Sequence, residues 1–182
     1  MSQALPAKNK LGYEHYVCYP DDGLRHEIID GNHFVNPAPT LDHQRFSRRI
    51  QFQLYDQIEA EGRGEVFNAS CDVQLTEHDI VQPDLIVVMN KHRLIMTPAK
   101  IEGVPDLIVE VLSPAAKKLD HGLKKELYER SGVPEYWIVD AAEHSVEQFV
   151  LRDAKYALAG SHSSSINAAT IENIRVDLTK VW

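Results

Sequence analysis

Residues 107–112 constrain the fold more than any other part of the sequence. They read Leu-Ile-Val-Glu-Val-Leu, so apolar side chains occupy both faces of an extended chain apart from one carboxylate. A strand that is apolar on both faces is typical of the centre of a sheet that is covered on both sides. We therefore predict an α/β domain with a central mixed sheet flanked by helices, and we predict that Glu110 lies inside it.

Apolar periodicity predicts the remaining elements. Helices are expected where apolar residues recur every four positions, and strands where short apolar or alternating runs are bounded by turn residues. The predicted helices cover residues 46–58 and, after Ser113-Pro114, a segment with Leu119, Leu123 and Leu127 on its core face. The predicted strands cover residues 26–29, 33–35, 66–75, 81–89, 106–112, 136–139, 146–151, 155–158 and 171–178.

Turn residues and irregular stretches predict how the chain is organised. Asp30-Gly31 separates two short β runs and is a strong hairpin signal. Residues 1–20 show no periodicity and are expected to form a loosely ordered N-terminal arm before a single domain, residues 21–182. Residues 160–165 read Gly-Ser-His-Ser-Ser-Ser and are expected to form a flexible loop.

Composition indicates an ordinary globular chain. The 182 residues can bury one substantial core but are short for two. No run approaches the ~20 apolar residues that span a bilayer, and Cys18 and Cys71 lack the spacing of a disulfide framework or a zinc site. We expect a soluble, cytoplasmic protein with reduced thiols and no membrane partner.

The net charge argues against a protein that coats nucleic acid nonspecifically. The chain has 19 basic and 27 acidic residues, a balance of −8, whereas nonspecific binding depends on neutralising many phosphates. A nuclease is still compatible with this balance, because local basic groups can face the phosphodiester. The local basic groups, each of which could equally be solvated surface, are Arg45, Arg48 and Arg49, then Lys91 and Arg93, then Lys117, Lys118, Lys124 and Lys125.

Three acids stand where a core would favour apolar residues: Glu27, Asp84 and Glu110. A carboxylate in an apolar strand carries a desolvation cost unless it is paired or binds a cation. If the strands of Asp84 and Glu110 are neighbours, the two carboxylates can meet at one cation. Oxygen ligands of this kind suit Mg²⁺ or Mn²⁺, and the nine scattered histidines are expected to lie mostly on the surface.

Lys124 is the fourth candidate for the site. It lies four residues after Asp120 on the helix that is predicted to follow the Glu110 strand. An ordinary helical ion pair between Asp120 and Lys124 would account for both residues, so spacing leaves a catalytic and a structural role open. The sequence has no Gly-rich nucleotide loop, phosphate-binding loop or serine-hydrolase motif.

Several segments closely resemble the Uma-two (Uma2) family of restriction-endonuclease-like proteins, over about residues 24–150. The segments that carry the resemblance are Glu27-Ile28-Ile29-Asp30-Gly31, Gln82-Pro83-Asp84-Leu85, residues 105–114, Asp120, Lys124, Tyr128 and residues 132–140. The family belongs to the PD-(D/E)xK superfamily, so the resemblance implies a restriction-endonuclease-like core. It also implies metal-assisted hydrolysis of phosphodiester bonds in nucleic acid, with DNA the expected substrate.

The resemblance assigns a role to each matching residue. It makes Asp84 and Glu110 metal ligands for Mg²⁺ or Mn²⁺, with the backbone carbonyl of Val111 as a further ligand, and Glu27 the acid of the N-terminal element. Leu112 stands where the superfamily motif places its lysine. Lys124 on the following helix is then the residue that takes the role of this lysine.

Two other readings of the same residues stay open. The protein could keep the nuclease fold without turnover and act as a binding or regulatory module. Asp84, Glu110 and Lys124 could instead form a purely structural ion-pair cluster, although apolar replacements often stabilise a core as well as such clusters do. Relatives in the superfamily often act as dimers on duplex DNA, so a homodimer is expected, but no residue locates its interface.

Overall fold

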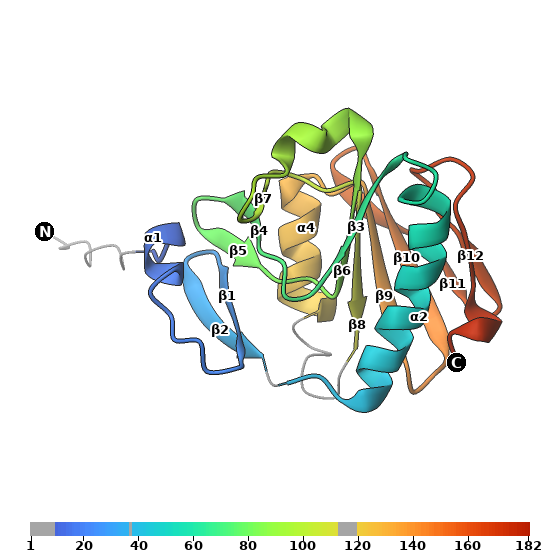
Figure 1. The fold of residues 1–182 in the computed structure, drawn as a ribbon, viewed down its shortest axis with the longest axis horizontal. Helices are drawn as coiled ribbons and strands as arrows, with labels where there is room; N and C mark the ends of the chain where they lie inside the picture. The colour runs from blue at the N-terminus through green and yellow to red at the C-terminus, as the bar shows by residue number, and fades with distance from the viewer. Residues whose placement is uncertain (1–9, 37, 113–119) are drawn as a thin grey trace, which may run out of the picture.

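The computed structural model describes residues 10–36, 38–112 and 120–182. Its main element is a six-stranded mixed sheet in the order β11-β10-β9-β8-β6-β3 (Figure 1). Only the central pair β8 and β9 is parallel among these neighbours. The strands are β3 (Gly64–Asn68), β6 (Leu85–Met89), β8 (Leu107–Val111), β9 (Glu135–Asp140), β10 (Ser145–Arg152) and β11 (Lys155–His162). The predicted α/β class with a central mixed sheet is confirmed.

Helices cover the two faces of this sheet. Helix α2 (Leu41–Ile58) lies on one face, and helix α4 (Lys125–Ser131) lies on the other (Figure 1). Along β8, Val109 belongs to the core that contains α2, whereas Ile108 belongs to the core that contains α4. Because side chains alternate along a strand, Glu110 shares the face of Ile108 and points toward α4.

A second, smaller sheet packs beside the first in the order β2-β1-β5-β4-β7. Its strands are β1 (Arg25–Ile29), β2 (Asn32–Asn36), β4 (Val73–Thr76), β5 (Asp79–Val81) and β7 (Ile101–Glu102). The predicted hairpin is confirmed: β1 and β2 pair around Asp30 and Gly31, which both have positive φ angles, 51° and 72°. This backbone twist matches that of paired strands and favours Asp-Gly.

Helix α2 forms where the four-residue periodicity predicts it. Phe46, Ile50, Leu54 and Ile58 are all buried. The helix begins earlier than the apolar pattern does, because the Thr40 hydroxyl caps it by accepting a hydrogen bond from the His43 N–H at 3.2 Å. The cap sets where the first turn lies, and that turn carries His43 toward the sheet.

Two predicted strands each divide between the two sheets. The segment 66–75 consists of β3 and β4, and the segment 81–89 consists of β5 and β6. Pro83 stands between β5 and β6, where its missing N–H and fixed φ interrupt the ladder. The chain thus crosses from the small sheet to the large one directly before Asp84.

The C-terminal region also differs from the expectation. The predicted flexible loop 160–165 is largely strand, because β11 runs to His162 and β12 (Ser165–Asn167) begins three residues later. The predicted strand 171–178 shrinks to β13 (Arg175–Asp177), which pairs with β12 in a separate two-stranded ribbon, and the 3₁₀ turn η3 (Leu178–Lys180) follows. Composition suggested a loop, but pairing with neighbouring strands orders this region.

The helix predicted after Ser113-Pro114 is described only from residue 120 onward, so Leu119 lies outside the described residues. A π-helical turn, η2 (Asp120–Lys124), leads into α4. The wider turn shifts the side chains around the axis, so Leu127 is buried but Leu123 is 43% exposed. The prediction that Leu123 lies on the core face is wrong, and Lys124 is the residue that points inward.

Residues 1–9 of the predicted N-terminal arm lie outside the described residues. Residues 13–16 form the short helix α1 (Tyr13–Tyr16), and the Leu11 N–H donates a hydrogen bond to the Gly31 carbonyl oxygen. The 3₁₀ helix η1 (Asn90–Ile95) follows β6, and Cys18 and Cys71 are both free. Among the helices of the described segments, none is long and apolar enough to cross a membrane.

Candidate active site

Glu27, Glu110 and Lys124 meet in the core between the two sheets. The Lys124 ammonium lies 2.9 Å from Glu110 Oε1 and 3.0 Å from Glu27 Oε1, and at most 2% of each side chain is exposed. The Tyr128 hydroxyl also donates to Glu110 Oε1 at 2.8 Å. The structure therefore brings together three residues that sequence reasoning selected from β1, β8 and the start of the following helix.

Glu27 is further held by β2 and by the segment before β6. Its Oε2 accepts a hydrogen bond from the Asn36 amide at 2.5 Å, and its Oε1 accepts one from the Gln82 N–H at 2.8 Å. These donors and the Lys124 ammonium compensate the burial of the Glu27 carboxylate. Glu27 thus connects the β1–β2 hairpin of the small sheet to Lys124, the residue directly before α4.

Asp84 lies next to this cluster but has its own partners. Its Oδ1 is 2.6 Å from Arg25 Nη1, and its Oδ2 is 2.9 Å from His43 Nε2. The Val111 N–H donates to Asp84 Oδ2 at 2.8 Å. The structure thus shows a hydrogen bond from the Val111 N–H to Asp84. A role for the Val111 carbonyl oxygen as a metal ligand stays a prediction.

Strand register explains why Asp84 and Glu110 are close. Leu85 pairs with Val109 in the antiparallel β6–β8 ladder, so extending the register by one residue sets Asp84 opposite Glu110. Directly opposite side chains in antiparallel strands lie about 5 Å apart at Cβ. The expectation that neighbouring strands bring the two carboxylates together is met.

The two carboxyl groups have pKa values shifted in opposite directions. Burial raises the pKa of Glu110, and the nearby Asp84 and Glu27 charges add to the rise, while Lys124 opposes it. Burial also acts to raise the pKa of Asp84, but His43, Arg25 and the Val111 N–H outweigh it and hold that pKa below its usual range. The site thus holds two neighbouring carboxyl groups whose pKa values are shifted in opposite directions, a pattern typical of functional sites.

The donor set is chemically suited to a hard divalent cation. Asp84 and Glu110 supply carboxylate oxygens from adjacent strands, which is the ligand type that Mg²⁺ prefers. Within the described segments, no group of three or more His, Cys, Asp or Glu side chains is arranged to hold a metal ion. In this arrangement Arg25 and His43 contact the two oxygens of Asp84, and Lys124 contacts Oε1 of Glu110, so a cation would share or displace these contacts.

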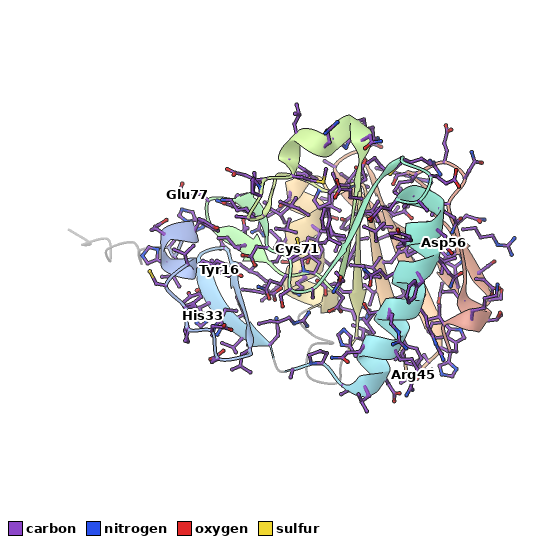
Figure 2. The ribbon with its side chains drawn as sticks, in the orientation of Figure 1. Tyr16, His33, Arg45, Asp56, Cys71 and Glu77 are labelled. Carbon is purple, nitrogen blue, oxygen red and sulfur yellow. The ribbon has the colours of Figure 1, made fainter. Side chains whose placement is uncertain are left out.

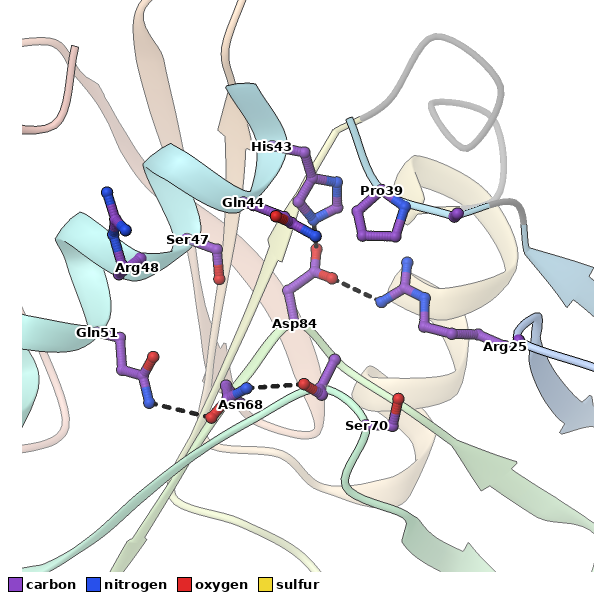
Figure 3. A pocket seen from close by; sticks show the side chains of 13 residues that line it. Arg25, Pro39, His43, Gln44, Ser47, Arg48, Gln51, Asn68, Ser70 and Asp84 are labelled. Atoms are coloured by element: carbon purple, nitrogen blue, oxygen red, sulfur yellow. Dashed lines mark hydrogen bonds and ion pairs between the residues drawn. The ribbon is translucent and has the colours of Figure 1, made fainter. Parts of the chain in front are cut away.

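A cavity of about 440 Å³ opens beside Asp84. Figure 3 shows Arg25 and His43 on either side of the Asp84 carboxylate, with Arg48 and Gln51 on the neighbouring turns of α2. Gln51 donates to Asn68 Oδ1 at 3.2 Å, which links α2 to β3 at the cavity wall. The cavity lets a ligand from solvent approach Asp84 past polar and cationic side chains.

Comparison with protein families identifies the chain. The model of the Uma2 family, described as "Putative restriction endonuclease", matches residues 13–178. The chain belongs to the Uma2 family. The resemblance noted in the sequence is thereby confirmed over nearly the whole chain.

A solved structure supports the fold of this Uma2 protein. The crystal structure of "a putative nuclease belonging to DUF820 from Anabaena variabilis ATCC 29413" matches with a TM-score of 0.77 and 13% sequence identity. The match covers 94% of this chain and 97% of that chain. At this identity the likeness shows a shared fold. A search among curated proteins finds no match.

Sequence reasoning missed His43 and Arg25 at this site. His43 was included among histidines expected mostly on the surface, but only 7% of it is exposed and it contacts Asp84. Its position was a usable signal, because it lies three residues before Phe46 and therefore on the apolar stripe of α2. Arg25 gave no comparable signal, since its contact with Asp84 joins residues that are distant in sequence.

The basic residues selected from the sequence differ in location and in hydrogen-bond partners in the Uma2 protein. Arg48 lines the cavity, whereas Arg49 donates to carbonyl oxygens of Val181 and Trp182 and so anchors the C-terminus. Lys124 is buried rather than available as surface charge. Lys117 and Lys118 lie outside the described residues. Arg48 is therefore the member of the Arg45–Arg49 stretch that lines the cavity beside Asp84.

Proposed function

We propose that this Uma2 protein is a metal-dependent endonuclease that hydrolyses phosphodiester bonds in nucleic acid. The observation that carries the proposal is the buried cluster of Glu27, Glu110 and Lys124 at the strand position that neighbours Asp84, whose carboxylate lines an open cavity. These residues come from four separate segments, and apolar residues in their place often stabilise a core as well as such a cluster does. The family description supports the same reaction class.

In this proposal each residue has a defined task. Asp84 and Glu110 hold Mg²⁺ or Mn²⁺, with the Val111 carbonyl as a further ligand. The bound cation supplies Lewis-acid stabilisation of the charge that builds up on the phosphate. Lys124, held by Glu110 and Glu27, orients the attacking water or stabilises the transition state.

Arg25 and His43 complete the site from the cavity side. Both contact Asp84 in the structure: Arg25 at Oδ1, a contact that yields when a cation takes this oxygen, and His43 at Oδ2. Arg25 is then available to bind the substrate phosphate, which its guanidinium suits. His43, whose Nδ1 is buried without a partner, is a positioning residue that holds Asp84 through Nε2.

Metal binding and cleavage test the proposal together. Wild type, Glu110→Gln and the control Glu65→Gln, an exposed residue of β3, are compared by calorimetry with Mn²⁺ and by cleavage of plasmid, single-stranded DNA and RNA. We expect Glu110→Gln to lose both properties and Glu65→Gln to keep both. Cleavage that survives in metal-free buffer, or that Glu110→Gln retains, would overturn the proposed mechanism.

A non-catalytic binding module is the second candidate. It is favoured by the ion pairs that already occupy Asp84 and Glu110, together with the lack of a three-ligand cluster in the described ranges 10–36, 38–112 and 120–182. This candidate predicts nucleic-acid binding without Mn²⁺ binding or cleavage.

The nuclease proposal includes DNA as the substrate and a homodimer as the active state. Sedimentation with and without duplex DNA tests the dimer.

A further inference from the structure

A second cavity adjoins the one that opens on Asp84. It has a volume of about 320 Å³ and shares three lining residues with the first cavity, namely Gly23, Arg25 and Ser70. Its other walls include the aromatic side chains of Tyr16, Tyr19 and His26, and we call it the aromatic cavity. The two cavities therefore adjoin at Arg25, with the Asp84 carboxylate in one and aromatic rings in the other.

The aromatic wall is preordered by contacts among its own side chains. The Tyr19 ring stacks on His33 with centroids 4.1 Å apart and planes 20° apart, and it lies 5.1 Å from His26. His26 is bridged to His33 at 2.9 Å and to Asp22 at 3.1 Å. Figure 2 shows His33 and Tyr16 at the end of the molecule that α1, β1 and β2 form. Tyr19 is thus held as a platform before any ligand arrives.

Polar groups surround the rings. The Tyr16 hydroxyl donates to Asp72 Oδ1 at 2.6 Å, and the Gln82 amide donates to that same hydroxyl at 2.9 Å. Arg25 supplies a cation at the junction of the cavities, and the Tyr19 hydroxyl is buried without a partner. Flat aromatic walls with hydrogen-bonding groups at their edges are how proteins hold unpaired nucleobases.

We infer that the aromatic cavity binds an unpaired nucleobase of the strand whose phosphate lies beside Asp84. The part that concerns the phosphate rests on the proposed nuclease function. A base within a duplex is stacked on both sides and cannot enter such a cavity without leaving the helix. The substrate class is therefore single-stranded or locally unpaired nucleic acid, with Arg25 between the base and phosphate positions.

Binding of short fluorescein-labelled strands by the full chain, without divalent metal, tests this inference. The ligands are oligo-dT, oligo-rU and a duplex of equal length. We expect wild type to bind the single strands at least tenfold more tightly than the duplex. Tyr19→Ala should weaken single-strand binding by roughly tenfold, the scale of one stacked base, while Tyr19→Phe keeps it because the ring remains.

Tyr55→Ala is the matched control, since Tyr55 is an exposed tyrosine of α2 that lines neither cavity. It should bind single strands as wild type does. Equal affinity of wild type for single strands and duplex, or unchanged single-strand affinity in Tyr19→Ala, would overturn the inference. Because Tyr19→Ala could also unfold, wild type is crosslinked in parallel to oligo-dT that carries one 5-iodouracil. A crosslink within residues 16–26, or at Ser70 or Gln82, which also line the aromatic cavity, supports the site, and crosslinks confined to other residues refute it.

Failure of this inference and failure of the nuclease proposal give different results. Metal-dependent cleavage that prefers duplex DNA and ignores Tyr19→Ala would retain the nuclease and remove the base site. Single-strand binding that depends on Tyr19, with neither Mn²⁺ binding nor cleavage, would retain the base site and remove the nuclease.

Discussion

Replacement of Lys124 by methionine tests the buried cluster most directly. The side chain keeps its length but loses the charge that lies 2.9 Å from Glu110 and 3.0 Å from Glu27. Removing one partner of a buried ion pair costs about 3–5 kcal/mol, because the remaining charge is left in the core. We expect Lys124→Met to lower the free energy of unfolding by about this amount near pH 8.

The cost should depend on pH in a defined direction. Burial already raises the pKa of Glu110 above its usual 4.5, and loss of the opposing Lys124 charge raises this pKa further. The folded variant therefore binds a proton that the unfolded chain has released, so its stability falls as pH rises from about 4.5 through the raised pKa. Near pH 5 the variant should regain much of the lost stability relative to wild type.

Urea unfolding at both pH values measures this prediction, provided that the slope with urea is unchanged. Lys125→Met is the control, because Lys125 lies on the same helix with its ammonium 4.2 Å from the Phe149 ring centroid, a contact that contributes about 0.5–1 kcal/mol at an exposed site. Lys124→Met combined with Glu110→Leu should recover only part of the lost stability, since apolar replacement of a buried pair is often neutral or better but Glu27 still loses its Lys124 partner. A cost below about 1 kcal/mol for Lys124→Met, equal at both pH values, would refute the buried arrangement.

Three further predictions concern the N-cap of α2, the buried Glu135 carboxylate and the pH dependence that Asp84 causes. Thr40→Ala should cost about 1 kcal/mol in urea unfolding because α2 loses its N-cap, while Thr40→Ser keeps it. Glu135→Ala should cost at least about 3 kcal/mol, because its carboxylate accepts hydrogen bonds from Trp137, Gln148 and the backbone of residues 169 and 170; a cost below 1 kcal/mol would contradict this. The pKa of Asp84 is lowered in the folded protein, so its contribution to stability is present above about pH 3.8 and is lost as pH falls through the pKa of the folded state. His43→Ala removes one cause of this shift, so unfolding curves of the variant should depend less on acid pH.

Local patterns in the sequence were sufficient for much of the fold. The Asp30-Gly31 hairpin, helix α2 and the buried β8 strand were all predictable, because turn geometry and side-chain periodicity act over a few residues. The acids of the site were also predictable, since a carboxylate in an apolar run conflicts with its surroundings. Glu27, Asp84 and Glu110 were selected on that conflict and lie together in the structure.

Only the tertiary structure decided how these acids are neutralised and from which side they are reached. The π-helical turn before α4 points Lys124 inward in place of Leu123, and no local pattern specifies that turn. Crossing between two sheets at Pro83 puts Asp84 within reach of Arg25 from β1 and His43 from α2. Such contacts join segments far apart in the chain, so they follow from the packing of whole elements and not from the propensity of any one of them.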